Sequence, residues 1–331
     1  MIKYPPIKIN LGLNVLRKRE DGFHDLETLF LESGRFHDTL EIVTGDDYSR
    51  TMASLAARYG DRCGISDGDI PALAQGISEN GKLMITVARK EGVDWDVRKD
   101  LCAKAYALLD NDFKLPPAKI FLEKNSPVGA GLGGGSADAA YTLTMLNDIC
   151  SLGLSTEQLA GYAARLGSDC AFFIFGRPMF GEGRGEVLTP FELAVDIVDA
   201  GGAACSGSRT GSSDGGNDSS GTGTARPCTR EHPEKDRPQY ELQIVIPEGI
   251  SVSTAEAYRG ITPAIPEMRL KDVLARPVSE WKDLLVNDFE ATVFKAHPEL
   301  AAIKQSLYDS GAVYASMSGS GSALFALYER Q

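Results

Sequence analysis

The residues best suited to chemistry begin with a glycine-rich segment at positions 127–140, Pro-Val-Gly-Ala-Gly-Leu-Gly-Gly-Gly-Ser-Ala-Asp-Ala-Ala. Glycine tolerates positive φ and lets backbone amides approach a ligand closely. Successive amides in such a turn, followed by a helix N-terminus, bind an anion such as phosphate. The alternating segment 118–124 precedes the loop like a strand, and good helix formers follow Ser136. The pattern is typical of a phosphate-binding loop, although a plain strand-to-helix connection also fits it.

The loop differs from two common nucleotide-binding loops. No Gly-Lys-Ser/Thr follows its glycines, which excludes a Walker A loop. A nominal Gly-x-Gly-x-x-Gly is present, but a dinucleotide site also needs a second strand that ends in an acidic residue about 20 residues later. Residues 155–167 are instead predicted to be helical. The loop therefore favours a mononucleotide over a dinucleotide.

Two charged residues could serve phosphoryl transfer, which needs positioning, charge neutralisation and usually a carboxylate near the attacking hydroxyl. Asp169 stands between a predicted helix end and a strongly apolar run, a position in which a carboxylate can be functional. A solvated cap or turn aspartate fits that position equally well. Lys8 lies within an alternating apolar strand, where a lysine usually points to solvent but can also supply charge to a phosphate.

These residues need elements that position them, and the pattern of apolar residues predicts both strands and helices. The predicted strands cover 7–15, 26–32, 38–43, 118–124, 240–247, 312–317 and 323–328. The predicted helices cover 100–110, 137–150, 156–166 (with Ser155 as N-cap) and 298–310. A second small-residue turn, Ser-Gly-Ser-Gly-Ser at 318–322, is either a plain hairpin or a segment that closes over the phosphate site.

Two segments resist assignment to regular elements. Residues 45–81 are expected to be an elaborated loop with a short helix near 52–59. In 201–224, Gly, Ser and Thr supply 17 of 24 residues, so the segment is expected to be flexible, with a lid over the site as the alternative.

Composition narrows the class of protein. The 331 residues suffice for two domains, and no apolar run approaches the ~18 residues of a membrane span. The N-terminus lacks the apolar core of a signal peptide, so a cytoplasmic protein is expected. A net charge of −12 argues against nucleic acid as a partner. The six cysteines form no Cys-x-x-Cys pair and lie near no suitable histidines, so a zinc site is not expected.

The order of these pieces resembles the GHMP small-molecule kinase superfamily. Within it, the chain looks most like the branch whose substrate is a cytidine diphosphate-linked methylerythritol. The segments that carry this resemblance are Lys8–Leu11, Arg19–Thr28, Gly129–Ala140, Leu166–Asp169, Gly181–Glu186, Asn287–Glu290 and Ser318–Ser322. The Asp-Gly-Phe-His block within the second segment separates this branch from the mevalonate and homoserine kinases.

The resemblance implies a fold of the α/β class with an α+β two-domain architecture. Residues 1–190 are expected to form the ATP-binding domain that carries the glycine loop, with 45–81 as its elaborated loop. Residues 194–238 are expected to be a flexible low-complexity insertion. Residues 239–331 are expected to form a smaller, ferredoxin-like domain, with the active site in the cleft between the two domains. Either a monomer or a homodimer is compatible with this expectation.

The resemblance also implies catalytic and nucleotide-binding residues. Asp169 is expected to orient or deprotonate the substrate hydroxyl, and Lys8 to pair with it and stabilise developing charge. Lys124 is expected near the adenine of ATP, and Ser136 near Mg²⁺, for which no further protein ligand is evident. The residues expected to wrap the ATP phosphates are Pro127, Val128, Gly129, Ala130, Gly131, Leu132, Gly133, Gly134, Gly135, Ser136 and Ala137.

On the substrate side, the resemblance implies that Asn10 holds the methylerythritol hydroxyls and that Thr254 touches the diphosphate. Phe23 and Tyr258 would stack on the cytosine from two sides, with His24 reading its polar edge. Phe23 stands where tyrosine is commoner, which keeps the stacking and loses a hydroxyl.

Three other functions remain open from the sequence. A different specificity within the superfamily, mevalonate or homoserine kinase, would make the Phe23-His24 pair incidental. A nucleotide-binding sensor would need neither Lys8 nor Asp169. A dinucleotide-dependent oxidoreductase would bind NAD in place of ATP.

Overall fold

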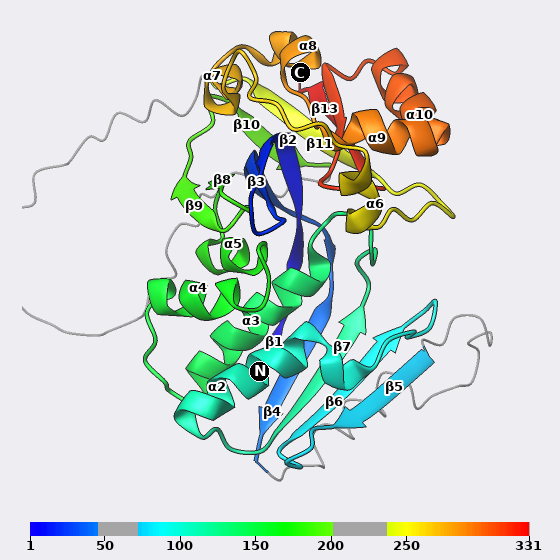
Figure 1. The fold of residues 1–331 in the computed structure, drawn as a ribbon. Helices are drawn as coiled ribbons and strands as arrows, with labels where there is room; N and C mark the ends of the chain where they lie inside the picture. Colours follow the sequence, from blue (N-terminus) through cyan, green and yellow to red (C-terminus); the bar gives the residue numbers. More distant parts are fainter. Residues whose placement is uncertain (46–71, 201–236, 331) are drawn as a thin grey trace, which may run out of the picture.

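The computed structural model describes residues 1–45, 72–200 and 237–330. The short helix predicted near 52–59 and the Gly/Ser/Thr-rich segment 201–224 lie outside these residues. Within them, the chain folds into a lower part that carries the N-terminus and an upper part that carries the C-terminus, as oriented in Figure 1.

The lower part is built on a five-stranded sheet. Its strands, in spatial order, are β1 (Ile2–Lys3), β4 (Thr39–Thr44), β7 (Ala118–Lys124), β6 (Leu83–Arg89) and β5 (Ala72–Ile77). The parallel pair β6 and β7 is joined through α2 (Leu101–Phe113), and the other neighbours are antiparallel. The other helices of this part are α3 (Gly134–Ile149), α4 (Thr156–Ala164) and α5 (Cys170–Phe175). A continuous apolar core joins the helices to β4, β6 and β7, which fixes the loop between β7 and α3 on a rigid base.

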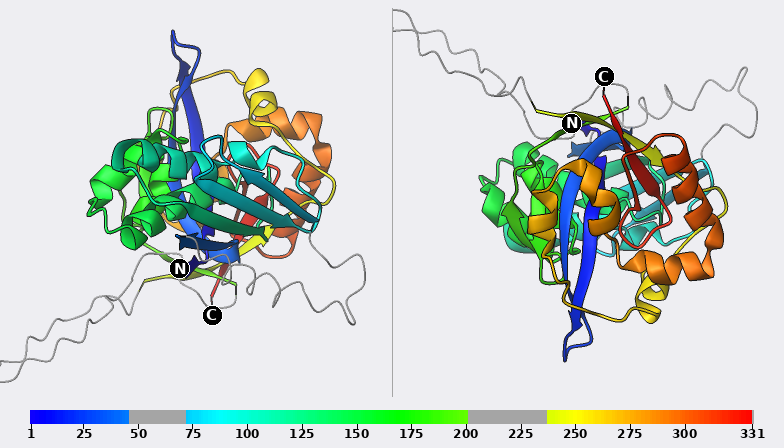
Figure 2. Two further views of the ribbon diagram at one scale, coloured as in Figure 1. Left: turned by 90° about the horizontal axis from the view of Figure 1, so that it is seen from below. Right: turned by 90° about the horizontal axis from the view of Figure 1, so that it is seen from above.

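A long hairpin links the two parts. Strands β2 (Pro6–Lys18) and β3 (His24–His37) pair antiparallel and continue into β8 (Met179–Glu182) and β9 (Val187–Pro190). Apolar side chains of both hairpin strands, Ile7 and Leu29 among them, are fully buried against residues of the upper part such as Trp281. The turn of the hairpin projects beyond the rest of the molecule in both views of Figure 2.

The upper part holds a four-stranded sheet in the order β10 (Asp196–Asp199), β11 (Gln239–Val245), β13 (Leu324–Glu329), β12 (Tyr314–Met317). Its helices are α6 (Thr254–Arg259), α7 (Leu270–Leu274), α8 (Trp281–Leu284), α9 (Phe289–Ala296) and α10 (Pro298–Asp309). The predicted arrangement, a glycine-loop part and a smaller C-terminal α/β part, is confirmed.

Most predicted elements are present with shifted ends, and the predicted cap is confirmed, because Ser155 and Gln158 form a reciprocal capping box at the start of α4. The apolar run after Asp169 is the helix α5. Two predictions were wrong within the described residues. The expected loop 45–81 contains β5, and the expected insertion 194–238 contains β10.

Long-range pairing explains both errors. Strand β5 is mostly exposed and has little apolar pattern, but β6 supplies its hydrogen-bonding partner. Strand β10 has only four residues, yet it pairs in parallel with β11, and the carboxylate of Asp199 accepts hydrogen bonds from Ser33 and Gly34 of β3. The C-terminal sheet therefore begins at residue 196, ahead of the boundary expected at residue 239.

Candidate active site

The glycine loop runs from the end of β7 to the start of α3, as the sequence predicts. Gly129, Gly131 and Gly133 all have positive φ, between 71° and 75°, which other residues adopt only with strain. Helix α3 begins at Gly134, after Gly133 as its left-handed N-cap, and has no side-chain cap at this end. Its first backbone N–H groups are therefore available to an anion, together with the positive end of the helix dipole.

A buried carboxylate, that of Asp38, anchors the start of this loop. One Asp38 oxygen accepts hydrogen bonds from the backbone N–H groups of Asn125 and Ser126, each at 2.7 Å. The other oxygen accepts from the Ser126 hydroxyl, also at 2.7 Å, and from the ammonium of Lys124. Since Asp38 follows β3 directly, it fastens the loop to the hairpin.

The ammonium of Lys124 contacts two aspartates, because it also lies 2.6 Å from Asp138 of α3. Burial lowers the pKa of Lys124, but the nearby Asp138 and Asp38 outweigh it and raise that pKa. Burial raises the pKa of Asp138 well above its usual value despite Lys124. Lys124 lines cavities of about 480 and 320 Å³ beside the loop. The structure thus places Lys124 beside the predicted nucleotide site, with its charge engaged within the protein.

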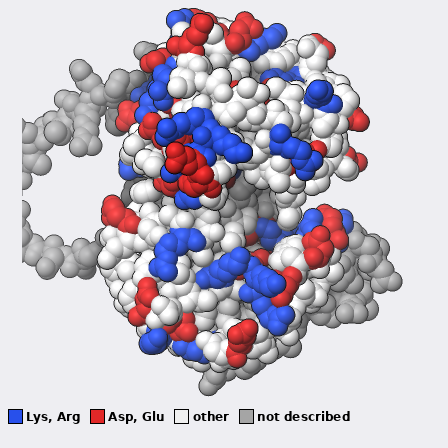
Figure 3. Space-filling view, viewed as in Figure 1, with Lys and Arg blue, Asp and Glu red and all other residues white. Residues whose placement is uncertain are grey.

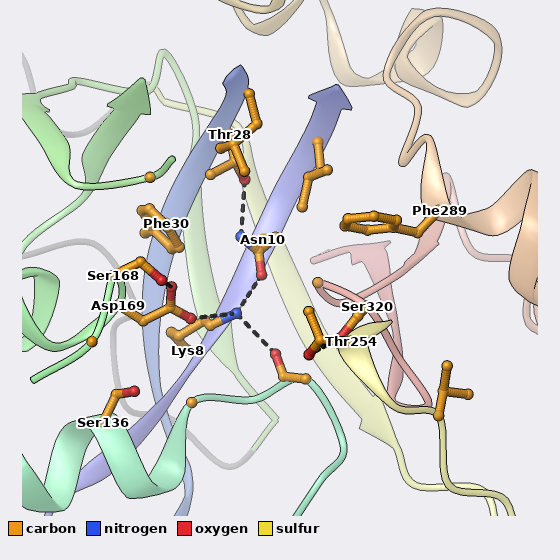
Figure 4. Close-up of a pocket in the computed structure, with 18 of the residues that line it drawn as sticks. Lys8, Asn10, Thr28, Phe30, Ser136, Ser168, Asp169, Thr254, Phe289 and Ser320 are labelled. Carbon is orange, nitrogen blue, oxygen red and sulfur yellow. Dashed lines mark hydrogen bonds and ion pairs between the residues drawn. The ribbon is translucent and has the colours of Figure 1, made fainter. Parts of the chain in front are cut away.

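Lys8, on β2, lines a cavity of about 500 Å³ between the two parts. Only 3% of its surface is exposed, and its ammonium donates to the Asn10 Oδ1 at 2.5 Å and the Gly131 carbonyl at 2.9 Å. The same ammonium lies 3.4 Å from a carboxylate oxygen of Asp169 (Figure 4). Asn10 in turn donates to Thr28 on β3 at 3.0 Å, which fixes the amide orientation. The site therefore joins residues of the hairpin, the glycine loop and α5.

Asp169 occupies the N-cap position of α5, and its side chain makes no capping hydrogen bond there. Its carboxylate, 28% exposed, faces Lys8 and accepts a hydrogen bond from Ser168 at 3.1 Å. Of the two interpretations left open by the sequence, the geometry favours a carboxylate aimed into the cavity over a solvated cap.

The second small-residue turn, 318–322, packs directly against the glycine loop. The Ser318 hydroxyl donates to the Gly131 carbonyl at 3.3 Å, and the backbone N–H of Ala323 donates to the Ala130 carbonyl at 3.1 Å. The buried amide of Asn287 holds this turn by donating to the carbonyls of Met317 and Gly319, at 2.7 and 2.9 Å. The turn closes against the predicted phosphate site and is more than a plain hairpin.

The predicted substrate residues form two groups. Thr254 and Tyr258, from α6, line the same cavity as Lys8 and Asp169. His24, at the start of β3, stacks on Tyr258 with ring centroids 4.8 Å apart and an interplanar angle of 23°. Phe23 is 54% exposed in the hairpin turn, and the guanidinium of Arg184 lies 4.9 Å from its ring centroid. In the structure, His24 rather than Phe23 is the ring that faces Tyr258.

Partial burial, and to a lesser extent the charge of Lys18, lower the pKa of the His24 imidazole, which favours its neutral form. A neutral imidazole carries one donor and one acceptor nitrogen. His24 can therefore recognise the polar edge of a base, which also presents donors and acceptors.

Sequence reasoning missed two site residues that the structure reveals, Asp38 and Asn287. Each acts through backbone groups far away in the sequence, and no local pattern marks such a contact. Asn287 stands in a segment quoted above for the resemblance, and its burial gives it a specific role in holding the turn.

Within the part of the chain that the structure describes, no group of three or more His, Cys, Asp or Glu side chains could hold a metal ion. Ser136 and Asp169 line one cavity and offer hard oxygen atoms, the donors that Mg²⁺ prefers. Since Mg²⁺ at phosphoryl-transfer sites is held largely by water and substrate phosphates, this sparse donor set fits it. No described helix has the length and hydropathy needed to span a membrane.

Comparison with known proteins agrees with this geometry. The family described as GHMP kinases N terminal domain matches residues 100–177, and GHMP kinases C terminal matches residues 270–331. A hollow between the two parts is visible on the face shown in Figure 3. The cavity between the two parts is lined by glycines of the loop, Lys8 and Asp169. The fold and the site thus define a small-molecule kinase of the GHMP class.

The relatives narrow that class. The chain is 38% identical to the 4-diphosphocytidyl-2-C-methyl-D-erythritol kinase of Bacteroides thetaiotaomicron, over 99% of this chain and 92% of that protein. It is 37% identical to the enzyme of the same name from Parabacteroides distasonis, over 100% of this chain and 92% of that protein. The chain belongs to the 4-diphosphocytidyl-2-C-methyl-D-erythritol kinase family.

Solved structures agree with this assignment. A crystal structure of 4-(cytidine 5'-diphospho)-2C-methyl-D-erythritol kinase superposes with a TM-score of 0.63 at 26% identity, covering 99% of this chain and 90% of that one. A mevalonate kinase structure, at 11% identity and a TM-score of 0.54, covers 99% of this chain and 91% of that one and shares the fold.

Proposed function

We propose that this chain transfers the γ-phosphoryl group of ATP to the 2-hydroxyl of 4-diphosphocytidyl-2-C-methyl-D-erythritol, giving the 2-phosphate and ADP. This is a step of the non-mevalonate isoprenoid pathway, carried out in the cytoplasm. The observation that carries the proposal is the pairing of Lys8 with Asp169 in one cavity with the glycine loop. A nucleotide-binding sensor would need no such pair beside its phosphate site.

The glycine loop, residues 127–137, and the N-terminus of α3 bind the phosphates of ATP through backbone N–H groups. Ser136 would help to hold Mg²⁺, which would supply positive charge to neutralise the phosphate oxygens. The Gly131 carbonyl and the Asn10 amide orient the Lys8 ammonium. Lys8 then stabilises negative charge that develops on the transferred group.

The substrate 2-hydroxyl lies beside the Lys8–Asp169 pair, within reach of both groups. Its oxygen forms the new bond to the γ-phosphorus as the bond to the β,γ-bridging oxygen breaks, and ADP leaves with that electron pair. Asp169 accepts the hydrogen bond of the hydroxyl and lies where its proton leaves. Asn10 holds the neighbouring hydroxyls of the methylerythritol and Thr254 the diphosphate. Phe23, His24 and Tyr258 form the cytosine site at the hairpin end of the cavity.

The test is ADP release by the purified protein with Mg²⁺, ATP and 4-diphosphocytidyl-2-C-methyl-D-erythritol, with mevalonate and homoserine as parallel substrates. Turnover of the cytidyl substrate alone is expected. Turnover of mevalonate or homoserine would support a small-molecule kinase but contradict the proposed specificity for the cytidyl substrate. Tight ATP binding without transfer to any alcohol would replace the enzyme by a sensor, and protection by NAD without protection by ATP would favour an oxidoreductase.

A further inference from the structure

Arg184 lines the same cavity as Lys8 and Asp169 and has no role in the mechanism above. It stands in the tight turn 183–186 between β8 and β9, where Gly183 and Gly185 both have positive φ. The Gly183 carbonyl accepts a hydrogen bond from the backbone N–H of Leu26 on β3, at 2.7 Å. The turn is therefore fixed to the hairpin that also carries Phe23, and Arg184 projects from a defined backbone.

Two contacts orient the guanidinium of Arg184. One face covers the ring of Phe23, at 4.9 Å from the ring centroid. The Nε–H lies 3.3 Å from the carboxylate of Glu186, which also accepts the backbone N–H of Arg184 at 2.5 Å. A guanidinium has five N–H donors, and 44% of this side chain remains exposed. Donors are thus left for a ligand in the cavity.

The charges on the cavity wall point to an anionic ligand for Arg184. Among the described residues that line it, the charged ones are Lys8, Asp169 and Arg184. Lys8 is engaged by Asp169, Asn10 and Gly131, so Arg184 is the cation that stands apart from that group. The whole chain has a net charge of −12, which repels an anionic substrate unless a local cation offsets it.

The order of groups along the proposed substrate matches this arrangement. The diphosphate lies between the cytidine and the methylerythritol that carries the reacting hydroxyl. Arg184 contacts Phe23 of the proposed cytosine site and lines the cavity that contains Lys8 and Asp169. A planar guanidinium binds phosphate oxygens in a bidentate manner, which an ammonium cannot do.

We propose that Arg184 binds the diphosphate of the substrate, with Phe23 and Glu186 holding its guanidinium in place. This proposal rests on the proposed function and deepens it. The diphosphate would be bound by the charged group of Arg184 in addition to the hydroxyl of Thr254. Arg184 is then a binding residue that selects diphosphate-linked substrates over uncharged alcohols.

The experiment compares Arg184→Gln and Arg184→Lys with the wild type. A matched control is Arg276→Gln. The side chain of Arg276 is similarly exposed, at 45%, and pairs with one glutamate, Glu280. Arg276 is not among the residues that line the cavity. Steady-state kinetics give kcat and KM for the cytidyl substrate and for ATP. Cytidine, CMP and CDP, tested as inhibitors competitive with that substrate at saturating ATP, measure the contribution of each phosphate.

Loss of a charged hydrogen-bonding contact in Arg184→Gln is expected to raise the KM for the cytidyl substrate about 10- to 100-fold. The kcat and the KM for ATP should stay near those of the wild type. Inhibition by CDP should weaken by a similar factor while inhibition by cytidine is unchanged. Arg184→Lys should fall between, and Arg276→Gln should match the wild type.

If inhibition by cytidine and inhibition by CDP weaken equally in Arg184→Gln, Arg184 only supports Phe23 and the proposal is overturned. An unchanged KM for the cytidyl substrate together with unchanged inhibition by CDP would also overturn it. Failure of the wild type to phosphorylate the cytidyl substrate would instead refute the proposed function. In that case, calorimetric titration of wild type and Arg184→Gln with CDP and cytidine still tests Arg184 by itself. Binding of CDP no tighter than cytidine by the wild type would then overturn it.

Discussion

Replacement of Gly131 by alanine should separate the glycine loop from the turn 318–322. Gly131 has a φ of +75°, and a Cβ added to it would lie 2.3 Å from the Ser318 carbonyl oxygen. It would also lie 3.0 and 3.1 Å from backbone atoms of Gly321. These neighbours are backbone, so the methyl group cannot be accommodated by a side-chain rotation. The loop and the turn must move apart.

The size of the effect follows from two contributions. A left-handed conformation costs an L-residue about 1–2 kcal/mol, and overpacking costs about 1–3 kcal/mol more. Gly153, in the turn between α3 and α4, provides the matched control, since its φ is +68° and no atom lies within 4 Å of an added Cβ. Gly153→Ala therefore has the conformational cost without the clash.

The assay is chemical denaturation of both variants, together with turnover. Gly131→Ala should lose about 1–3 kcal/mol more stability than Gly153→Ala. It should also lose most of its turnover, because the Gly131 carbonyl that orients Lys8 moves with the loop. Equal stability and equal turnover of the two variants would refute the reasoning, since the loop would then not be confined by Ser318.

Three further substitutions test other parts of the site. Asp169→Asn should retain ATP binding and lower kcat at least ~100-fold, the range for a positioned acid–base group; near-normal turnover would exclude the role. Because burial raises the pKa of Asp138, the folded state holds a proton that the unfolded state releases above about pH 4, so stability falls as pH rises. Asp138→Asn removes this titration, so its denaturation midpoint should gain on that of the wild type as the pH rises above about 4, and a constant difference would contradict the assignment. Asn287→Leu leaves two buried carbonyls without their donor and should lower the free energy of unfolding, measured by denaturation, by about 2–4 kcal/mol. Turnover should also fall as Gly319 shifts, and wild-type stability would refute the role of Asn287 in holding the turn.

The local parts of the site could be predicted from the sequence because local chemistry determines them. The strand 118–124 has the predicted bounds, and the loop after it needs glycine at its positive-φ positions. The pairing of Lys8 with Asp169 joins residues 161 positions apart. For each of them, the residue pattern alone allowed both a functional and a solvent-exposed interpretation. The resemblance to a known family, rather than local physics, brought these two residues together in the prediction.

Asp38 shows why the rest could not be predicted. An aspartate at the first position of a predicted strand is typically solvated, and its partners, Lys124 to Ser126, lie 86 to 88 positions away. Its burial becomes favourable only when the end of β7 presents two backbone N–H groups and a hydroxyl to its carboxylate. The same holds for Asn287, whose acceptors are carbonyls of a different segment.

Lys8 explains why the site depends on both parts of the molecule. A buried ammonium is costly unless charged and polar partners compensate it, and those of Lys8 come from its own strand, the glycine loop and α5. The carbonyl of Gly131 is itself held by Ser318 of the upper part, which Asn287 fixes through neighbouring carbonyls. Since each group positions the next, the ammonium is oriented only when the hairpin, the loop and the C-terminal turn are packed together. A change at Asn287, which lies outside the residues that line the cavity, should thus alter phosphoryl transfer through the C-terminal turn.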